Sequence, residues 1–122
     1  MSKILLIDDE IEPRELIKDY LEGSGFEIVE AGTGREGLEI LKSDGNSITA
    51  VLTDIIMPDM NGLDMIKELR RFNRGMKVLA MSGYEDELAQ AKRAGAAATF
   101  QKPLNMEEIK NFLELITERE SA

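Results

Sequence analysis

Acidic, hydroxyl and amine side chains follow four apolar runs of the sequence. Asp8 and Asp9 come directly after the first run, Asp54 after the third, Ser82 after the fourth and Lys102 just after the fifth. If the runs are parallel strands, these side chains meet outside the carboxyl edge of one sheet. Three carboxylates there outweigh one ammonium, and carboxylates packed so closely cannot all stay ionised unaided. A divalent cation would balance them, and Mg²⁺ or Mn²⁺ suits all-oxygen ligands better than Zn²⁺ does.

Composition narrows the function classes. The chain has 122 residues, which predicts a single domain over 1–122. Its formal net charge of -9 argues against nucleic acid or a membrane as a direct partner, because phosphates would be repelled. Cysteine and histidine are both absent, so chemistry must run on carboxylates, hydroxyls and amines. No segment has the roughly 20 apolar residues that span a bilayer. We expect a cytoplasmic protein.

The elements that position these residues can be expected from the hydrophobic pattern. Short apolar runs at residues 4–7, 26–29, 50–53, 78–81 and 97–100 alternate with helical patterns near 12–23, 35–42, 61–72, 86–94 and 105–116. Alternating βα units predict a (βα)5 doubly wound, flavodoxin-like domain, with a five-stranded parallel sheet and helices on both faces. The second run keeps Glu27 and Glu30 and is typical of an edge strand. Residues 117–122 are expected to be a frayed polar tail.

Helix signals refine these expectations. Leu16, Ile17, Tyr20 and Leu21 form one apolar stripe on the first helix. Asn105 is expected to cap the last helix at its N-terminus.

The strand order decides which acid is the reactive one. If the order is 2-1-3-4-5, the third strand is central. Asp54 then has the acidic pair on one side and Ser82 and Lys102 on the other. A phosphoryl group on Asp54 would be stabilised on both flanks, by a cation and by an ammonium with a hydroxyl. Taken singly, each of these residues is weak evidence, since an acid after a strand is often only a helix cap. Their convergence predicts that Asp54 is a phosphoacceptor.

The ordered motifs resemble those of the response-regulator receiver domain of two-component signalling, over essentially the whole chain. These motifs are Asp8-Asp9, Asp54 followed by Met57-Pro58 and Gly62, Ser82-Gly83, and Phe100-Gln101-Lys102-Pro103. The resemblance implies a phosphorylation-dependent switch that takes its phosphoryl group from a partner phosphohistidine. The partner would be a sensor histidine kinase or a histidine phosphotransfer protein. The downstream target is unknown, and the chain would be a monomer or a phosphorylation-dependent dimer.

The resemblance also implies residue roles. Mg²⁺ would be held by Asp8, Asp9, Asp54 and the backbone carbonyl of Ile56. Ser82 and Lys102 would bind the phosphoryl group, and the Lys102–Pro103 peptide would be cis. Phe100 would turn inward as the Ser82 loop moves, which would alter a partner surface near the fourth helix, fifth strand and fifth helix. Phe100 stands where many receivers have tyrosine, and the plainer alternative is that it is only a core aromatic.

Ile56 and Tyr84 stand where polar residues are frequent in the family. We expect them to shield the phosphorus from water and to lengthen the lifetime of the phosphoryl group. The plainer alternative is that both point to solvent and have no effect on hydrolysis.

Two other function classes remain open at this stage. An aspartyl-phosphate phosphatase of the haloacid dehalogenase type needs a second Asp two residues after the nucleophile, where Ile56 stands. A flavodoxin-like cofactor-binding domain needs a hydroxyl- and glycine-rich phosphate loop, where Asp8-Asp9-Glu10 would repel phosphate. We therefore expect a regulatory domain that assists only its own phosphorylation and dephosphorylation. It could stand alone or belong to a longer protein.

Overall fold

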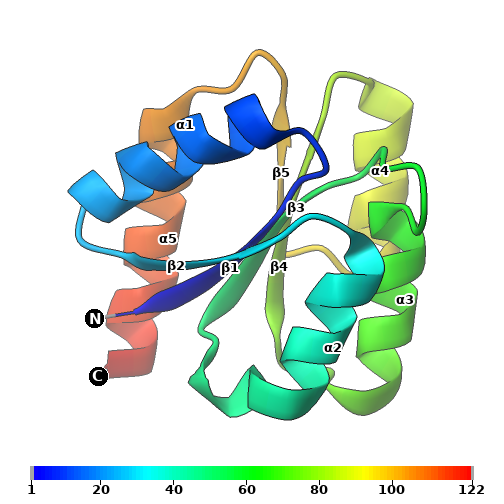
Figure 1. Ribbon diagram of the computed structural model, residues 1–122, viewed down its shortest axis with the longest axis horizontal. Coiled ribbons are helices and arrows are strands. Elements are labelled where there is room, and N and C mark those ends of the chain that lie inside the picture. Colours follow the sequence, from blue (N-terminus) through cyan, green and yellow to red (C-terminus); the bar gives the residue numbers. More distant parts are fainter. Residues whose placement is uncertain (1, 122) are drawn as a thin grey trace.

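The chain folds as alternating strands and helices (Figure 1). The computed structural model describes residues 2–121, and its description of side chains ends at residue 117. The elements are β1 (Lys3–Ile7), α1 (Ile11–Gly23), β2 (Glu27–Ala31), α2 (Gly34–Asp44), the 3-10 turn η1 (Gly45–Ser47), β3 (Ala50–Asp54), α3 (Gly62–Phe72), β4 (Lys77–Ser82), α4 (Glu85–Ala94), β5 (Ala98–Gln101) and α5 (Met106–Ser121).

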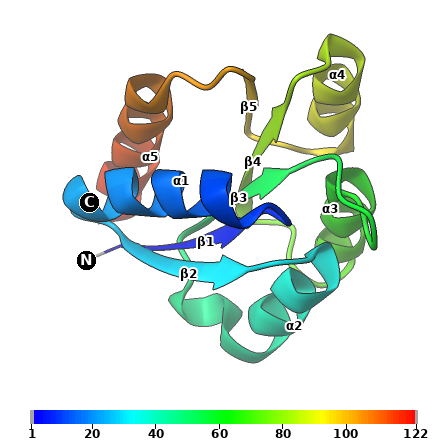
Figure 2. The ribbon, with the colours of Figure 1, turned by 45° about the horizontal axis from the view of Figure 1, so that its top comes forward.

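The strands form one parallel sheet in the order β2-β1-β3-β4-β5, as Figure 2 shows. This order confirms the doubly wound prediction, and it places β2 at an edge, as its two glutamates indicate. The strand β3 is central and buried along its whole length. The residue that ends it therefore lies in the middle of the carboxyl edge of the sheet.

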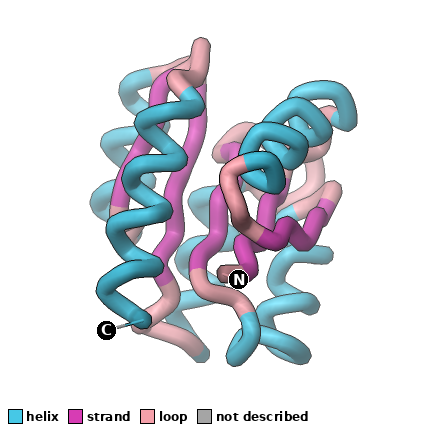
Figure 3. Tube along the Cα trace, turned by 90° about the vertical axis from the view of Figure 1, so that its left-hand side faces the viewer, coloured by secondary structure: helices cyan, strands magenta, loops and turns pink. Residues whose placement is uncertain are grey.

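Two apolar cores lie on opposite faces of the sheet. Because side chains alternate along a strand, Leu5 and Ile7 of β1 pack with α2, α3 and α4, whereas Ile4 and Leu6 pack with α1 and α5. Figure 3 turns the face with α1 and α5 toward the viewer. Burial on both faces explains why the central strands read as nearly unbroken apolar runs.

Local signals set several helix ends. Asn61 Oδ1 accepts a hydrogen bond from the Asp64 backbone N–H at 2.9 Å and caps α3. Asn105 Oδ1 accepts from the Glu108 N–H at 3.2 Å, which matches its expected role as a cap. Gly95 ends α4 with a φ of 114°, a left-handed conformation that favours glycine.

The apolar stripe of α1 is narrower than the sequence indicates. Ile17 and Leu21 are buried, but Leu16 is 72% exposed and Tyr20 is 38% exposed. Only one row of α1 side chains faces the sheet, and Leu16 and Tyr20 lie on its flank. Of the four residues predicted to form one apolar stripe, only Ile17 and Leu21 are therefore part of the core.

The last helix extends further than its apolar pattern. Helix α5 runs from Met106 to Ser121, so most of the segment 117–122 that is expected to fray has a helical backbone. Fraying of this end stays a prediction, and residue 122 lies outside the described part. None of the described helices, α5 included, is long and apolar enough to cross a membrane.

Candidate functional site

The parallel register brings the predicted residues to one edge of the sheet. The pairing of β1 with β3 sets Asp8, the residue after β1, level with Asp54, the last residue of β3. Ser82 ends β4, and Lys102 follows β5 directly. Asp8, Asp54 and Ser82 are only 1%, 4% and 1% exposed. Burial of polar side chains costs free energy unless partners satisfy them, so their burial together makes this cluster a candidate functional site.

Three carboxylates gather at this edge. One carboxylate oxygen from each of Asp8, Asp9 and Asp54 lies within 4.8 Å of the others. Asp8 Oδ1 accepts a hydrogen bond from the Glu10 N–H at 3.0 Å. Burial raises the pKa of Asp8 above its usual value, the hydrogen bond from Glu10 opposes this, and the charge of Asp54 raises the pKa further.

The oxygens present fit a hard divalent cation. Asp8 Oδ2 is the one buried side-chain oxygen or nitrogen, within the described residues, that lacks a hydrogen-bond partner. A buried oxygen of this kind is available to bind an ion or a water. With no nitrogen or sulfur ligand in the cluster, the donor set suits Mg²⁺ or Mn²⁺.

Lys102 supplies the opposing charge. Its Nζ donates a hydrogen bond to Asp54 Oδ2 at 2.7 Å, and the side chains of Lys102 and Asp54 are 33% and 6% exposed. Desolvation alone would lower the pKa of Lys102, but the hydrogen bond and the charge of Asp54 raise it above its usual value. The ammonium of Lys102 therefore stays charged at neutral pH. Among the three acids, Asp54 is the one that it pairs with.

A pocket of about 430 Å³ opens over Asp54, with Ser82 and Lys102 in its lining. The Ser82 Oγ accepts a hydrogen bond from the Tyr84 N–H at 3.1 Å, so its own O–H remains available to a group that enters the pocket. Ile56 and Tyr84 also line this pocket and are 51% and 65% exposed. Whether they shield a phosphoryl group on Asp54 from water stays a prediction.

The backbone around Asp54 is held tightly. Thr53 Oγ1 donates to the Asp54 carbonyl at 2.9 Å, and the Gly62 N–H donates to the Ile55 carbonyl at 2.7 Å. A Cβ at Gly62 would lie 2.6 Å from the Asp54 carbonyl oxygen, so only glycine lets α3 begin this close to β3. The motif glycine is thus explained by close approach. The role of Thr53 is not visible from sequence, where this residue reads as an ordinary strand former.

The remaining predicted positions are arranged as follows. The Lys102–Pro103 peptide bond is cis, in agreement with the expectation. Phe100 is half-buried and meets Phe112 of α5 edge to face, with ring centroids 6.2 Å apart. In this structure Phe100 therefore belongs to the rim of the core between the sheet and α5.

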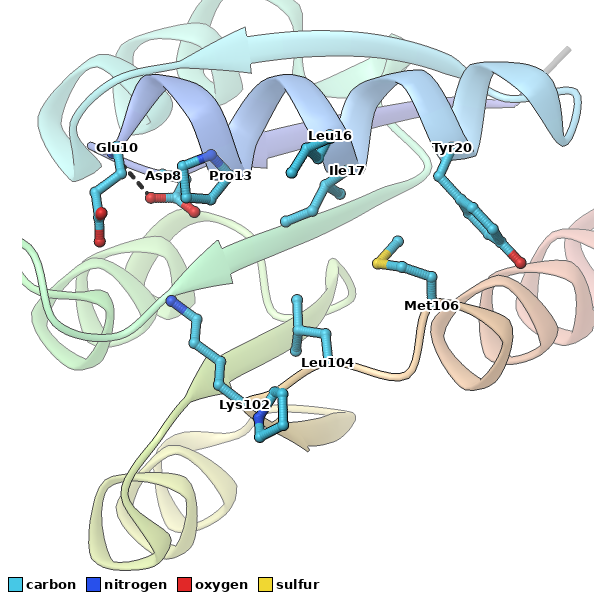
Figure 4. Close-up of a pocket in the computed structure, with 10 residues that line it drawn as sticks. Asp8, Glu10, Pro13, Leu16, Ile17, Tyr20, Lys102, Leu104 and Met106 are labelled. Carbon is cyan, nitrogen blue, oxygen red and sulfur yellow. Dashed lines mark hydrogen bonds between the residues drawn. The ribbon is translucent and has the colours of Figure 1, made fainter.

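An apolar groove of about 460 Å³ adjoins the site. Leu16 and Tyr20 of α1 lie on one side of it, and Leu104 and Met106 lie on the other (Figure 4). Lys102 lies at the same end of the groove as Asp8 and Glu10, whereas Tyr20 marks the opposite end. The groove leads directly to the charged cluster.

Besides Thr53, a second residue at the site was not predicted from the sequence. Arg14, on α1, donates a hydrogen bond from Nη1 to the Asp8 carbonyl oxygen at 2.8 Å. An arginine in an exposed helical pattern reads as solvated, and no local signal marks its partner.

Comparison with known proteins agrees with this geometry. The family model described as the response regulator receiver domain matches residues 4–114. Chemotaxis protein CheY1 of Helicobacter pylori is 37% identical over 120 residues, which cover 93% of this chain and 95% of that protein. The transcriptional regulatory protein CpxR of Escherichia coli K12 is 36% identical over 110 residues, which cover 89% of this chain and 46% of that protein. The chain thus spans about half the length of its CpxR relatives.

Solved structures give the same result. A response regulator receiver domain protein from Clostridium thermocellum superposes with a TM-score of 0.92 at 32% identity, covering 99% of this chain and 98% of that one. The response regulator protein TrrA of Thermotoga maritima, solved in complex with Mg(2+)-BeF, has a TM-score of 0.86 at 31% identity, covering 95% of this chain and 99% of that one.

Proposed function

The chain belongs to the response regulator receiver domain family of two-component signalling, and we propose that it is a switch in which Asp54 accepts a phosphoryl group from a partner phosphohistidine. One observation carries this proposal. The Asp54 carboxylate is buried at the base of an open pocket. The Lys102 ammonium lies 2.7 Å from one of its oxygens, and the hydroxyl of Ser82 lines the same pocket. Among the described residues, no ammonium forms an ion pair with Asp8 or Asp9.

The transfer is a single displacement. A carboxylate oxygen of Asp54 attacks phosphorus, an O–P bond forms, and the N–P bond of the phosphohistidine breaks with its electron pair going to the imidazole. Asp54 becomes an acyl phosphate and loses its own charge, because the electron pair released to the imidazole takes up a proton from solvent. The transferred phosphoryl oxygens bring their negative charge into the pocket. Lys102 follows this charge and exchanges its bond to Asp54 Oδ2 for one to a phosphoryl oxygen. The Ser82 hydroxyl donates to a second phosphoryl oxygen.

A divalent cation, Mg²⁺ or Mn²⁺, would be held by Asp8, Asp9, Asp54 and the backbone carbonyl of Ile56. When bound, it offsets the negative charge of the acids and of the incoming phosphoryl group. The orphaned Asp8 Oδ2 supports this ligand set. The chain itself holds Asp8 and Asp54 side by side at the ends of neighbouring strands, so their positions are set before any ligand binds.

The switch begins at Ser82. To reach the phosphoryl group, its side chain gives up the hydrogen bond from the Tyr84 N–H, and the loop between β4 and α4 follows. We infer that Phe100, packed edge-on against Phe112, turns inward to fill the space that this loop vacates. The surface made by α4, β5 and α5 then changes shape, and the downstream partner reads that change.

The apolar groove between α1 and the segment after β5 is the docking site of the phosphodonor protein. Leu16, which is 72% exposed, offers a hydrophobic anchor beside the entrance to the charged cluster. A partner helix seated there would present its phosphohistidine toward Lys102 and Asp54. The phosphodonor protein that binds there is a sensor histidine kinase or a histidine phosphotransfer protein.

The other two function classes, a phosphatase and a cofactor-binding domain, fit the chain less well. Family membership favours a regulatory domain over a phosphatase, and Ile56 offers no acid two residues after Asp54. The carboxylates of Asp8 and Asp9 at the carboxyl edge also oppose a phosphate-bearing cofactor without a cation. We propose that the chain catalyses only its own phosphorylation and dephosphorylation.

The proposal is tested by intact mass. The protein is incubated with Mg²⁺ and a small phosphodonor, and one phosphoryl adduct is expected. Asp54→Asn should give none, and Asp59→Asn, an exposed acid beyond the site, should behave as the wild type. An adduct of equal yield in Asp54→Asn would refute the assignment of the acceptor.

A further inference from the structure

Arg14 joins three parts of the fold beneath the acidic cluster. Its side chain is only 18% exposed, although it lies on a surface helix. Nη1 donates to the Asp8 carbonyl at 2.8 Å, and Nε donates to Glu30 Oε1 of β2 at 3.2 Å. The planar guanidinium can serve both acceptors at once, because its donors form a rigid fork.

The Asp8 carbonyl belongs to the peptide that links Asp8 to Asp9. The strand β1 ends at Ile7, so strand pairing does not hold this peptide in place. The Asp8 N–H donates to the Ala31 carbonyl at 3.2 Å, which holds the peptide before Asp8. The bond from Arg14 holds the peptide after it. That bond sets the peptide plane from which the Asp9 side chain departs.

Glu30 gives the guanidinium a carboxylate partner outside the acidic cluster. An arginine that is free to turn toward the cluster could pair with one of its carboxylates and compete with a cation there. The salt bridge from Arg14 to Glu30, which is 33% exposed, occupies Nε on the side toward β2. Gly32 leaves room for this arrangement, because a Cβ there would lie 3.3 Å from Nη1 of Arg14.

We propose that Arg14 is a positioning residue that fixes the Asp8–Asp9 peptide in the geometry for binding a divalent cation, with Glu30 as its restraining counter-ion. The inference rests on the proposed function, which takes Asp8 and Asp9 as ligands. Arg14 touches neither the cation nor the phosphoryl group. It acts through the backbone carbonyl of Asp8, in the way that partners of ligating groups orient ligands in other metal sites.

The test measures Mg²⁺ binding to the unphosphorylated full chain by isothermal titration calorimetry. Arg14→Met keeps the aliphatic stem and removes the donors, and it should raise the dissociation constant about tenfold or more. Arg14→Lys keeps the charge but not the fork, and it should give an intermediate value. Arg74→Met, an exposed arginine without a hydrogen bond or ion pair in the described part of the chain, makes the same charge change and should leave the constant unchanged.

Two controls distinguish a positioning role of Arg14 from a general effect of the substitution on stability. Ile116→Val weakens the core beneath α5, far from the acids, and shows what loss of stability alone does to Mg²⁺ binding. Glu30→Gln should weaken binding more in the wild type than in Arg14→Met, because only a guanidinium can turn toward the site acids. Equal effects of Glu30→Gln in both backgrounds would overturn the role of Glu30.

The outcomes also separate this inference from the proposed function. Arg14→Met that binds Mg²⁺ as tightly as the wild type, or no more weakly than Ile116→Val, would overturn the role of Arg14. A wild-type protein that binds Mg²⁺ but gains no phosphoryl adduct would refute the proposed function and leave the role of Arg14 standing. A wild-type protein that binds no Mg²⁺ would overturn both.

Discussion

Replacing Lys102 by methionine should reveal that its ammonium balances the charge of the acidic cluster in the absence of a cation. The substitution keeps the aliphatic stem and removes the charge that lies 2.7 Å from Asp54 Oδ2. The Asp54 side chain is 6% exposed, so its carboxylate would be left buried without a positive partner. Removal of one member of a fully buried pair costs about 3–5 kcal/mol, whereas exposed pairs contribute about 1 kcal/mol or less.

The geometry places this pair between those limits. Lys102 is 33% exposed and the pocket over Asp54 is open to water, so we expect a loss of about 2 kcal/mol in unfolding free energy. With a urea m-value of about 2 kcal/mol/M, the unfolding midpoint should fall by about 1 M in the presence of a chelator. Saturating Mg²⁺ should restore about half or more of this loss, because a cation at Asp8 and Asp54 supplies the missing positive charge.

The assay is urea unfolding followed by far-ultraviolet circular dichroism, with a chelator and with Mg²⁺. Lys67→Met, an exposed lysine on α3 with no ion pair in the described residues, is the matched control and should behave as the wild type in both conditions. If Lys102→Met unfolds at the wild-type midpoint in chelator, the pair does not stabilise the fold. If Lys102→Met loses the same unfolding free energy with and without Mg²⁺, the ammonium and the metal ion do not balance the same negative charge.

Four further predictions concern the site and its surroundings. Ile56→Asn and Tyr84→Glu place a polar group in the lining of the pocket, where it can orient the attacking water. Each should shorten the half-life of the phosphoryl group about tenfold, which corresponds to about 1.4 kcal/mol in the hydrolysis barrier. An unchanged or longer half-life in both variants and in the double variant would mean that these side chains do not control water access. Asp9→Ala should remove most of the phosphorylation rate with a small phosphodonor, together with most of the difference between Mg²⁺ and chelator; a wild-type rate that is equal in both would contradict the need for a cation. Gly62→Ala places a Cβ 2.6 Å from a backbone carbonyl oxygen of β3 and should lower unfolding free energy by about 1–3 kcal/mol in urea titrations; wild-type stability would show that α3 can move away without cost. Leu16→Asp should slow transfer from a phosphohistidine protein about tenfold and leave the rate with a small phosphodonor unchanged, since it alters only the groove; equal slowing with both donors would place the defect in the chemistry and not in docking.

Much of the fold follows from local pattern. The central strands are buried on both faces, so their sequences are almost continuous apolar runs that need no tertiary information to recognise. Asn61 and Asn105 cap helices through hydrogen bonds that reach only three residues along the chain. The exposed Leu16 is different, because the width of a buried helix stripe depends on how the helix crosses the sheet.

The reactive side chains of the candidate site, though not Arg14 or Thr53, could also be predicted from the sequence. Parallel strands all end at one edge, so Asp8, Asp54, Ser82 and Lys102 had to converge once the runs were read as strands of one sheet. The order of the strands then made Asp54 central. Residue type and position along the chain determined which groups could react.

Only the tertiary structure decided how those groups are held. The 2.7 Å bond from Lys102 to Asp54, the orphaned Asp8 Oδ2 and the bond from Arg14 to the Asp8 carbonyl each join atoms whose separation depends on strand register and helix packing. Charge and hydrogen-bond energies change steeply over an ångström, whereas a sequence pattern places a side chain only on a face or at an edge. The sequence by itself determined the kind of chemistry, and packing decided which oxygen is paired, which is free and which backbone carbonyl an arginine holds.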